Sequence, residues 1–312
     1  MPETNLAQAI EATNDSGSAY DANIKYLLAD KQILARILKY AVKDFFDMEI
    51  PDIIDNIGDD IDIGTRPVDP GLSNLGQIKK SDTEDNIPGE GKIFYDIRFT
   101  AYHSKDEIKF LINIEAQKSS DPKKLGYNLE NRVIFYLARM ISAQKQTEFF
   151  HSDYDSLKRV RSIWICMDNE EDGDSIEEIS LDRKAVFGNR KNPYNTGLIK
   201  GIIINIRNRK SVQSSKNILI SMLENLLSQI NVEDKKRILT EEYGMIMTTE
   251  LEGRIQTMCN LSENIRAISI EEERLNAIER MIRANATKEQ IISFGYTEEE
   301  FAKVESIVCT NT

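Results

Sequence analysis

The sequence predicts an α/β protein, with a mixed sheet flanked by helices and an all-helical C-terminal region. Residues 92–117 contain two strand-like segments joined by a short polar connection, which is typical of a β-hairpin. Two apolar runs, at 160–167 and 198–206, have the length and composition of buried strands. Amphipathic segments precede, separate and follow these strands, so we expect helices on both faces of the sheet.

The N-terminal part of the chain is expected to lead into this sheet through one long helix. Residues 1–20 are small and polar, and they predict a flexible tail. Residues 21–46 carry apolar side chains at helical spacing and predict an amphipathic helix. Residues 50–90 are rich in Asp, Gly and Pro, so we expect loops there with one or two short strands.

The elements after the hairpin alternate between helix and strand. Asp121 precedes a proline, which is a helix-start signal, and residues 123–146 have helical spacing. The acidic segment 168–182 is expected to be a linker between the two buried strands. Residues 214–230 are apolar at helical spacing and predict a helix that completes the domain.

The C-terminal region, residues 231–312, is acidic and helical in pattern. Thr287 and Thr297 each begin a stretch with capping-box spacing, which predicts two short helices in a helix–turn–helix arrangement. A DNA-reading helix usually begins with Arg, Lys, Asn or Gln, whereas this second helix begins with three glutamates. We therefore favour a packing or oligomerisation unit and divide the chain into 1–20, 21–230 and 231–312.

The hairpin carries the most specific chemical pattern. Side chains alternate between the faces of a strand, so Glu115 and Gln117 share one face of the second strand. If the turn centres near residues 103–104, Asp96 lies opposite Leu111 and on the same face as Glu115 and Gln117. Two carboxylates on one face are what a divalent-metal phosphodiesterase requires. The alternative is an ordinary solvated strand face.

The supply of metal ligands limits which ion such a site holds. The chain has only two histidines, His103 and His151, which leaves a histidine-built metal site or a Ser-His-Asp triad poorly supplied. Its three cysteines are odd in number and far apart, which argues against structural zinc and favours a reducing compartment. Any metal is therefore expected to be held by oxygen, which favours Mg²⁺ or Mn²⁺.

The location expected from the sequence is cytoplasmic, without a membrane span. No apolar run approaches the roughly 18–20 residues that cross a bilayer. The N-terminal segment lacks the basic and apolar regions of a secretory signal.

The net charge of −12 is unusual for a nucleic-acid binder, but bases gather in one segment. Residues 183–217 contain nine Lys or Arg and no Asp or Glu, so this stretch can neutralise phosphates. The alternative is a pair of basic, solvated loops. The nine bases are Arg183, Lys184, Arg190, Lys191, Lys200, Arg207, Arg209, Lys210 and Lys216.

A family resemblance covers roughly residues 92–168. The segments YDIRF, INIEAQK, GYNLENRVIFYLARMISAQ and VRSIWICM, in this order and spacing, resemble the PD-(D/E)XK nuclease superfamily. The likeness is narrower to the branch named PD-(D/E)XK nuclease family transposases, which is related to the recombination-promoting nucleases. A weaker likeness extends over the N-terminal helix, DANIKYLLADKQILARILKYAV. The resemblance implies a restriction-endonuclease-like fold.

The resemblance also implies roles for particular residues. Asp96 and Glu115 would be the metal-binding acids, and Gln117 falls where the superfamily usually has lysine, although glutamine is typical of this branch. Arg132 and Tyr136 on the following helix would face the site and hold metal-bound water or a DNA phosphate.

Two further sets of residues follow from the same pattern. Lys123, Lys124 or Arg132 would supply the charge that Gln117 lacks. An additional acid often lies upstream of the motif, and the sequence leaves several candidates open. They include Glu84, Asp85 and Glu90, and acids of the first predicted helix such as Asp30.

The implied activity is Mg²⁺-dependent hydrolysis of DNA phosphodiester bonds, associated with recombination or mobile elements. Cutting both strands of a duplex requires two sites, so a homodimer is one expectation from the chemistry. The alternative function is a non-catalytic module that keeps the nuclease fold to bind DNA or protein. The neutral Gln117 and the overall acidity favour that alternative.

Overall fold

The structure of the chain is a computed structural model. It describes residues 15–64, 84–87, 91–94, 96–103, 108–117, 119–169, 173–181, 185–188, 197–207, 214–228 and 230–310. Contacts divide the chain into two compact units, Met1–Cys259 and Asn260–Thr312. Over the described ranges, no helix is both long and apolar enough to cross a membrane.

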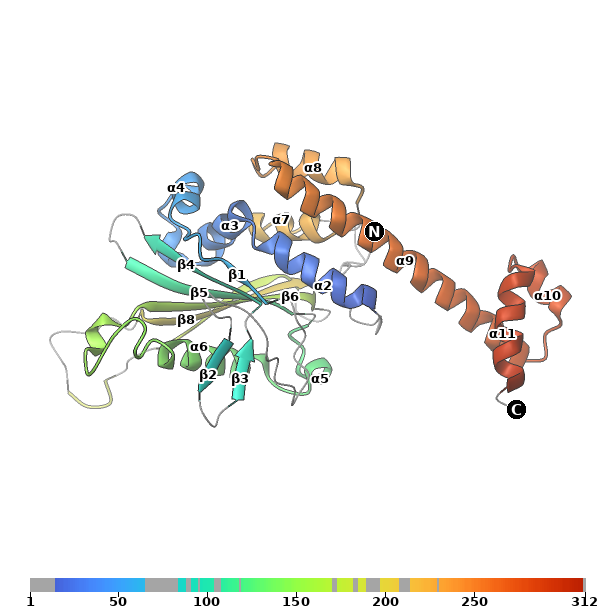
Figure 1. The fold of residues 1–312 in the computed structure, drawn as a ribbon, viewed down its shortest axis with the longest axis horizontal. Helices are drawn as coiled ribbons and strands as arrows, with labels where there is room; N and C mark the ends of the chain where they lie inside the picture. The colour runs from blue at the N-terminus through green and yellow to red at the C-terminus, as the bar shows by residue number, and fades with distance from the viewer. Residues whose placement is uncertain are drawn as a thin grey trace. The chain divides into compact units, whose positions relative to one another are not determined.

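The first unit contains all the strands (Figure 1). The strands are β1 (Asp62–Ile63), β2 (Glu84–Ile87), β3 (Gly91–Phe94), β4 (Ile97–His103), β5 (Ile108–Gln117), β6 (Arg159–Asn169), β7 (Ser175–Ser180) and β8 (Ile199–Arg207). Its helices are α2 (Asp15–Leu28), α3 (Lys31–Ala41), η1 (Lys43–Phe45), α4 (Ile50–Asp55), α5 (Pro122–Leu125), α6 (Leu129–Ser142), η2 (Tyr154–Ser156), α7 (Ile218–Leu227) and α8 (Val232–Glu241). Helix α9 (Thr249–Arg283) begins in this unit, and α10 (Lys288–Ser293) and α11 (Glu298–Thr310) follow in the second.

Six strands form one mixed sheet in the order β1-β4-β5-β6-β8-β7. Strands β5, β6 and β8 run parallel, while β1, β4 and β7 pair antiparallel with their neighbours. Strands β2 and β3 form a separate antiparallel pair. The predicted α/β class, with a mixed sheet and flanking helices, is confirmed.

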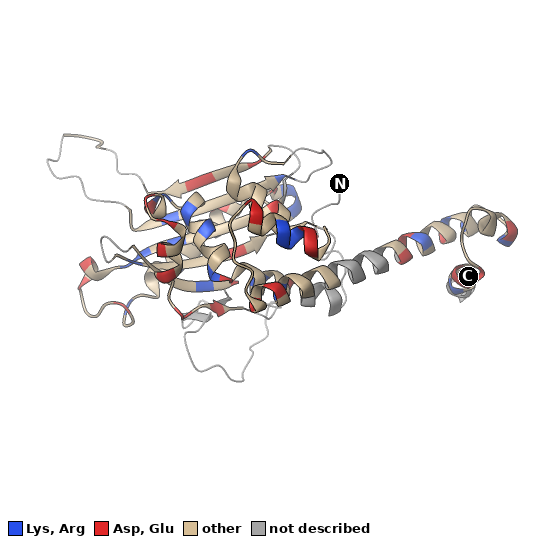
Figure 2. Ribbon diagram, turned by 90° about the horizontal axis from the view of Figure 1, so that it is seen from above, with Lys and Arg blue, Asp and Glu red and all other residues tan. Residues whose placement is uncertain are grey.

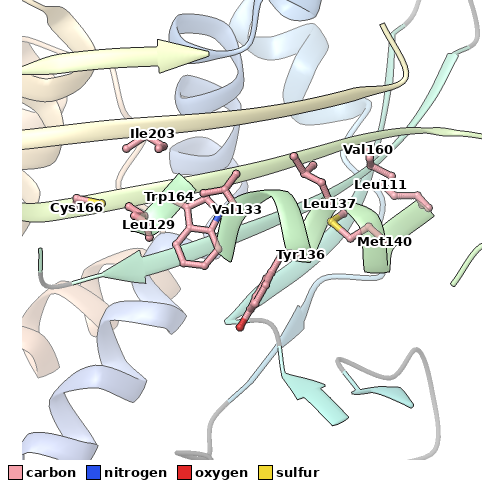
Figure 3. Packing of buried hydrophobic residues seen from close by; sticks show 10 residues of the cluster. All are labelled: Leu111, Leu129, Val133, Tyr136, Leu137, Met140, Val160, Trp164, Cys166 and Ile203. Atoms are coloured by element: carbon pink, nitrogen blue, oxygen red, sulfur yellow. The ribbon is translucent and has the colours of Figure 1, made fainter. Parts of the chain in front are cut away.

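Helices cover both faces of the six-stranded sheet (Figure 1). Helices α2, α3 and α7 lie on one side, and α6 lies on the other. Figure 3 shows how α6 packs, with Val133, Tyr136 and Leu137 against Leu111 and Trp164 of the strands. A strand side chain that packs against α6 is therefore buried rather than solvated, which matters for Glu115, the acid of β5.

The N-terminal helix differs from the prediction in two ways. The predicted single helix over 21–46 is two helices and a 3₁₀ turn, because Asp30 caps the second one by accepting a hydrogen bond from the Gln32 backbone N–H at 2.9 Å. The predicted flexible tail over 1–20 is helical from Asp15, and residues 1–14 lie outside the described residues. A short helix, α4, and the strands β1 and β2 occupy part of the expected loop region.

Two later elements also differ from expectation. The predicted helix over 123–146 is broken into α5 and α6 at Gly126, whose φ of 79° only glycine adopts easily. The helix start at Asp121 is confirmed, because its side chain accepts from the Lys123 N–H at 2.9 Å. The acidic linker predicted over 168–182 contains the edge strand β7, which pairs with β8.

The hairpin is confirmed, but its register is not. Residues 91–94 pair with β2, so β4 begins only at Ile97, which lies opposite Ile114. This register places position 96 next to Glu115 and not opposite Leu111, a shift of four residues. The strands extend further toward the connection than predicted, with His103 opposite Ile108. Because four is even, the predicted sharing of one face is preserved.

The boundary between the two units follows Cys259, later in the chain than the predicted boundary at residue 230. Helix α8 stays with the first unit, since Leu239 is fully buried there and the Tyr243 carbonyl accepts two bonds from Arg36. Both predicted capping boxes are present, at Thr287 with Gln290 and at Thr297 with Glu300. They start α10 and α11, which share an apolar cluster with the end of α9.

Candidate functional site

Two carboxylates meet at the end of β5, where the chain enters β4. The Asp96 backbone N–H donates to Glu115 Oε1 at 3.2 Å, and the Ala116 N–H donates to Asp96 Oδ2 at 3.0 Å. The two bonds are reciprocal, because each carboxylate accepts from a backbone N–H at or next to the other acid. The structure therefore brings together the two acids that the sequence singled out.

Glu115 is almost completely buried, with 3% of its surface exposed. Burial raises the pKa of its carboxyl well above the ordinary value, and the nearby Asp96 charge raises it further. Asn113, two residues earlier on the same face, donates to Glu115 Oε1 at 3.1 Å. The other amide atom, Asn113 Oδ1, is buried and has no hydrogen-bond partner among the residues that the structure describes. An acceptor left unpaired in this way is costly and requires an explanation.

Asp96 is less enclosed, and a lysine stands beside it. Burial raises the pKa of its carboxyl, although Lys25 opposes the change. Lys25 Nζ lies 2.9 Å from Asp96 Oδ1 and 2.7 Å from Asp21 Oδ2, and the lysine is 7% exposed. Burial lowers the pKa of this lysine, but the two acids outweigh that effect and leave it raised.

Lys25 is absent from the residues predicted from the sequence, whereas Asp21 is one of the acids of the predicted first helix that were left open as candidates for the additional acid. The available signal was their i,i+4 spacing on an amphipathic helix, which places both side chains on one face. That signal is common on solvated helices, so it does not identify a site without the fold.

Arg132 lies near the acids on the α6 side of the sheet. Its guanidinium donates to the hydroxyls of Tyr127 at 2.8 Å and Tyr136 at 3.0 Å, and it has a longer 3.5 Å contact with Gln117 Oε1. It also lies 5.2 Å from the centre of the Trp164 ring. All of these partners are neutral. The arrangement fixes a cation in place and leaves its charge available to an anion.

Tyr136 is mostly buried between these groups. Burial and the Glu115 charge raise the pKa of its phenol to about 12, so it stays protonated at neutral pH. Its ring packs edge-on against Trp164, with centroids 5.1 Å apart. Arg132, which bonds to Tyr136, is also the residue with the long contact to Gln117, and the role of the pair at the site stays a prediction.

The other predicted residues have different outcomes. Lys123 and Lys124 are exposed on α5, and their contact with phosphate stays a prediction. Asp30 is a helix cap that bonds to Gln32, which accounts for its carboxylate without a role at the site. Glu84 and Asp85 lie on β2, with side chains outside the described residues, and Glu90 lies wholly outside them.

The predicted basic stretch is described only in part. Arg207 lies 3.7 Å from Asp174, and Lys200 lies 3.5 Å from both Asp44 and Glu178. Lys216 is exposed at the start of α7, and the other six bases lie outside the described residues. Figure 2 shows that basic and acidic segments are interspersed over the described sheet and helices.

The donor set at the acids suits a hard divalent cation. Asp96 and Glu115 offer carboxylate oxygens, and the unpaired Asn113 Oδ1 is a third oxygen on the Glu115 face. Oxygen ligands of this kind suit Mg²⁺ and Mn²⁺. Within the described ranges, no three His, Cys, Asp or Glu gather closely enough to hold a metal by themselves.

Comparisons of the chain with protein-family models, with curated proteins and with solved structures returned no match.

Proposed function

We propose that the chain is a metal-dependent DNA endonuclease of the PD-(D/E)XK type, associated with recombination or mobile elements. The observation that carries this proposal is the pair Asp96–Glu115, in which each carboxylate accepts a hydrogen bond from a backbone N–H at or next to the other acid. Two like charges held side by side in a buried place are costly to folding. Such pairs recur where a cation or a proton must be bound for chemistry.

Three neighbouring residues would bind phosphate, orient a water molecule and position the guanidinium. Arg132 is held by neutral groups near the acids, so it is suited to bind a phosphate oxygen of the DNA strand. Gln117 ends β5 beside Arg132 and has an amide that can orient a water molecule without adding charge. Tyr136 keeps its proton and fixes the direction of the guanidinium.

A divalent cation, Mg²⁺ or Mn²⁺, held by Asp96 and Glu115 would polarise the phosphoryl oxygen and make a bound water more acidic. Because the described residues contain one such acid pair, cleavage of both strands of a duplex would need two copies of the chain.

The second candidate function is a nuclease-fold module that binds DNA or protein without cutting. The observation that favours it is the neutral Gln117 at the position where lysine is usual in the superfamily. A nicking assay separates the two functions, because a binding module retards DNA but leaves it intact.

The test is cleavage of supercoiled plasmid in Mg²⁺ or Mn²⁺ by the wild type, Asp96→Asn and Glu115→Gln. We expect both variants to lose at least about 100-fold in rate, because each removes charge where phosphoryl chemistry needs it. The matched control is Glu148→Gln, which neutralises another acid, one that pairs with Lys109 at 2.7 Å near the opposite end of β5. Cleavage that persists in both site variants, or is lost equally in the control, contradicts the proposal.

A further inference from the structure

We infer that Lys25, on helix α2, supplies the positive charge that Gln117 cannot, by donating to a phosphate oxygen of the bound DNA strand. This inference rests on the proposed function, because it assigns a further catalytic residue to the same site. It adds Lys25 to the predicted suppliers of that charge, which are Arg132 and, on the exposed helix α5, Lys123 and Lys124.

The hydrogen bonding of Lys25 leaves one donor for a ligand. An ammonium has three N–H donors. Two of them are accounted for by Asp21 at 2.7 Å and Asp96 at 2.9 Å. The third has no partner among the residues that the structure describes. A buried ammonium with a spare donor, held against a carboxylate of the site, is well placed to bind an anion.

The position of Lys25 complements that of Arg132. Helix α2 lies on one side of the sheet and α6 on the other (Figure 1). Each helix therefore brings one cation toward the end of β5, Lys25 at Asp96 and Arg132 at Gln117. Charge that develops on a phosphoryl group is stabilised by fixed cations around it. With glutamine at 117, Lys25 is the second fixed cation that the described residues provide beside the acid pair.

A purely structural role accounts for Lys25 less well. For comparison, Lys109 on β5 pairs with Glu148 and keeps 26% of its side chain exposed. Lys25 is more deeply buried and joins two acids. Burying an ammonium is costly, and an apolar residue would usually fill such a place at less cost. The buried Lys235 donates to two backbone carbonyls at a helix end, whereas Lys25 lies against two acids at the candidate site, so the charge of Lys25 is suited to binding an anion.

The experiment compares the full-length wild type with Lys25→Gln, Lys25→Arg and the control Lys109→Gln. Single-turnover cleavage is measured in Mg²⁺, and affinity for a DNA duplex is measured in Ca²⁺ over a range of salt concentrations. We expect Lys25→Gln to cleave about 100-fold more slowly. We also expect the slope of log K against log salt to fall by about 0.9, the value of one phosphate contact.

The remaining variants separate charge from packing. Lys25→Arg keeps the charge, so its salt slope should match the wild type and its cleavage rate should exceed that of Lys25→Gln. Lys109→Gln should match the wild type in both measurements. If Lys25→Gln is too unstable to study, Asp21→Asn/Lys25→Gln removes the charge together with one of its partners, and the same losses are expected.

Several outcomes overturn the inference. A salt slope and rate unchanged in Lys25→Gln would do so, as would equal losses in Lys109→Gln or a Lys25→Arg that behaves like Lys25→Gln. If the wild type binds DNA but never cuts it, the proposed hydrolysis fails by itself. The salt slope in Ca²⁺ then still decides whether Lys25 contacts phosphate.

Discussion

The two ends of the parallel strands bury charge in opposite ways. At the end where β6 and β8 begin, Asp44 is surrounded by bases, with Arg161 at 2.8 Å, Arg159 at 3.2 Å and Lys200 at 3.5 Å. At the end where β5 finishes, Glu115 is buried beside Asp96, another acid. Asp44 is paired directly with bases, whereas at the other end Lys25 pairs with Asp96, and Glu115 accepts hydrogen bonds from Asn113 and the Asp96 N–H.

The pKa values of Asp44 and Glu115 shift in opposite directions. Burial alone would raise the pKa of Asp44, but Arg161, Lys200 and Arg159 outweigh burial and lower it. Burial raises the pKa of Glu115, and its neighbouring acid adds to the increase. The comparison teaches that burial of charge does not mark a site by itself. A buried acid that its surroundings leave uncompensated is the better indicator.

The largest expected effect is at the end where Asp44 is paired with bases. Asp44→Ala leaves Arg161, which is fully buried, without its acid. We expect the free energy of unfolding to fall by about 3–5 kcal/mol, the usual cost of an uncompensated buried charge. Urea denaturation followed by circular dichroism measures this loss. A loss below about 1 kcal/mol would mean that Arg161 finds sufficient partners in the backbone carbonyls that it already contacts.

A third buried charge, Lys235, extends the comparison to a cation that two backbone carbonyls bind. Its Nζ donates to the Leu226 and Ser228 carbonyls at 2.8 Å each, at the end of α7. Burial lowers the pKa of this lysine from 10.5 to about 8. Between these values the unfolded chain binds more protons than the folded chain, so stability rises with pH.

We expect this rise to amount to about 3 kcal/mol between pH 8 and 10.5 and to be absent in Lys235→Met. The measurement is urea denaturation of both proteins at several pH values in that window. Lys236→Met is the control, because that neighbouring side chain is 23% exposed and pairs with acids. The same rise in Lys235→Met as in the wild type would assign it to other groups.

The sequence predicted most of the sheet because burial leaves a local pattern. The apolar runs of β6 and β8 and the alternation along β5 follow directly from the two-residue period of a strand. The boundaries that failed depended on single residues. Asp30 and Gly126 split predicted helices, and a cap or a positive φ is a weaker signal than a run of apolar residues.

The site was predictable only in part, for a related reason. Asp96, Glu115 and Gln117 lie close in sequence, so strand parity and a family resemblance were enough to select them. Lys25 reaches Asp96 across 71 positions of the chain, and Asn113 reads as one more polar residue of a strand. Contacts between distant elements depend on how α2 packs on the sheet, and no local pattern encodes that packing.

The smallest expected effect is a gain in stability, and it concerns Glu115 at the end of the sheet where β5 finishes. Glu115→Gln keeps the shape of the side chain and removes a charge that burial and Asp96 both disfavour. In the absence of divalent metal, we expect the free energy of unfolding to rise by roughly 0.5–2 kcal/mol, the range of a typical stabilising substitution. Cleavage should be lost in the same variant, so activity and stability move in opposite directions.

The matched control for this rise in the free energy of unfolding is Glu148→Gln, which removes an acid that pairs with a base, Lys109. That variant should be neutral or slightly destabilised and should keep its activity, because its charge is compensated and lies away from the site. Urea denaturation in EDTA measures all three proteins under one condition. If Glu115→Gln is destabilised as Glu148→Gln is, Glu115 must be compensated in solution, and the distinction between the two ends of the sheet fails. If only Glu115→Gln gains stability, the chain keeps a costly acid at that position because its function requires the charge.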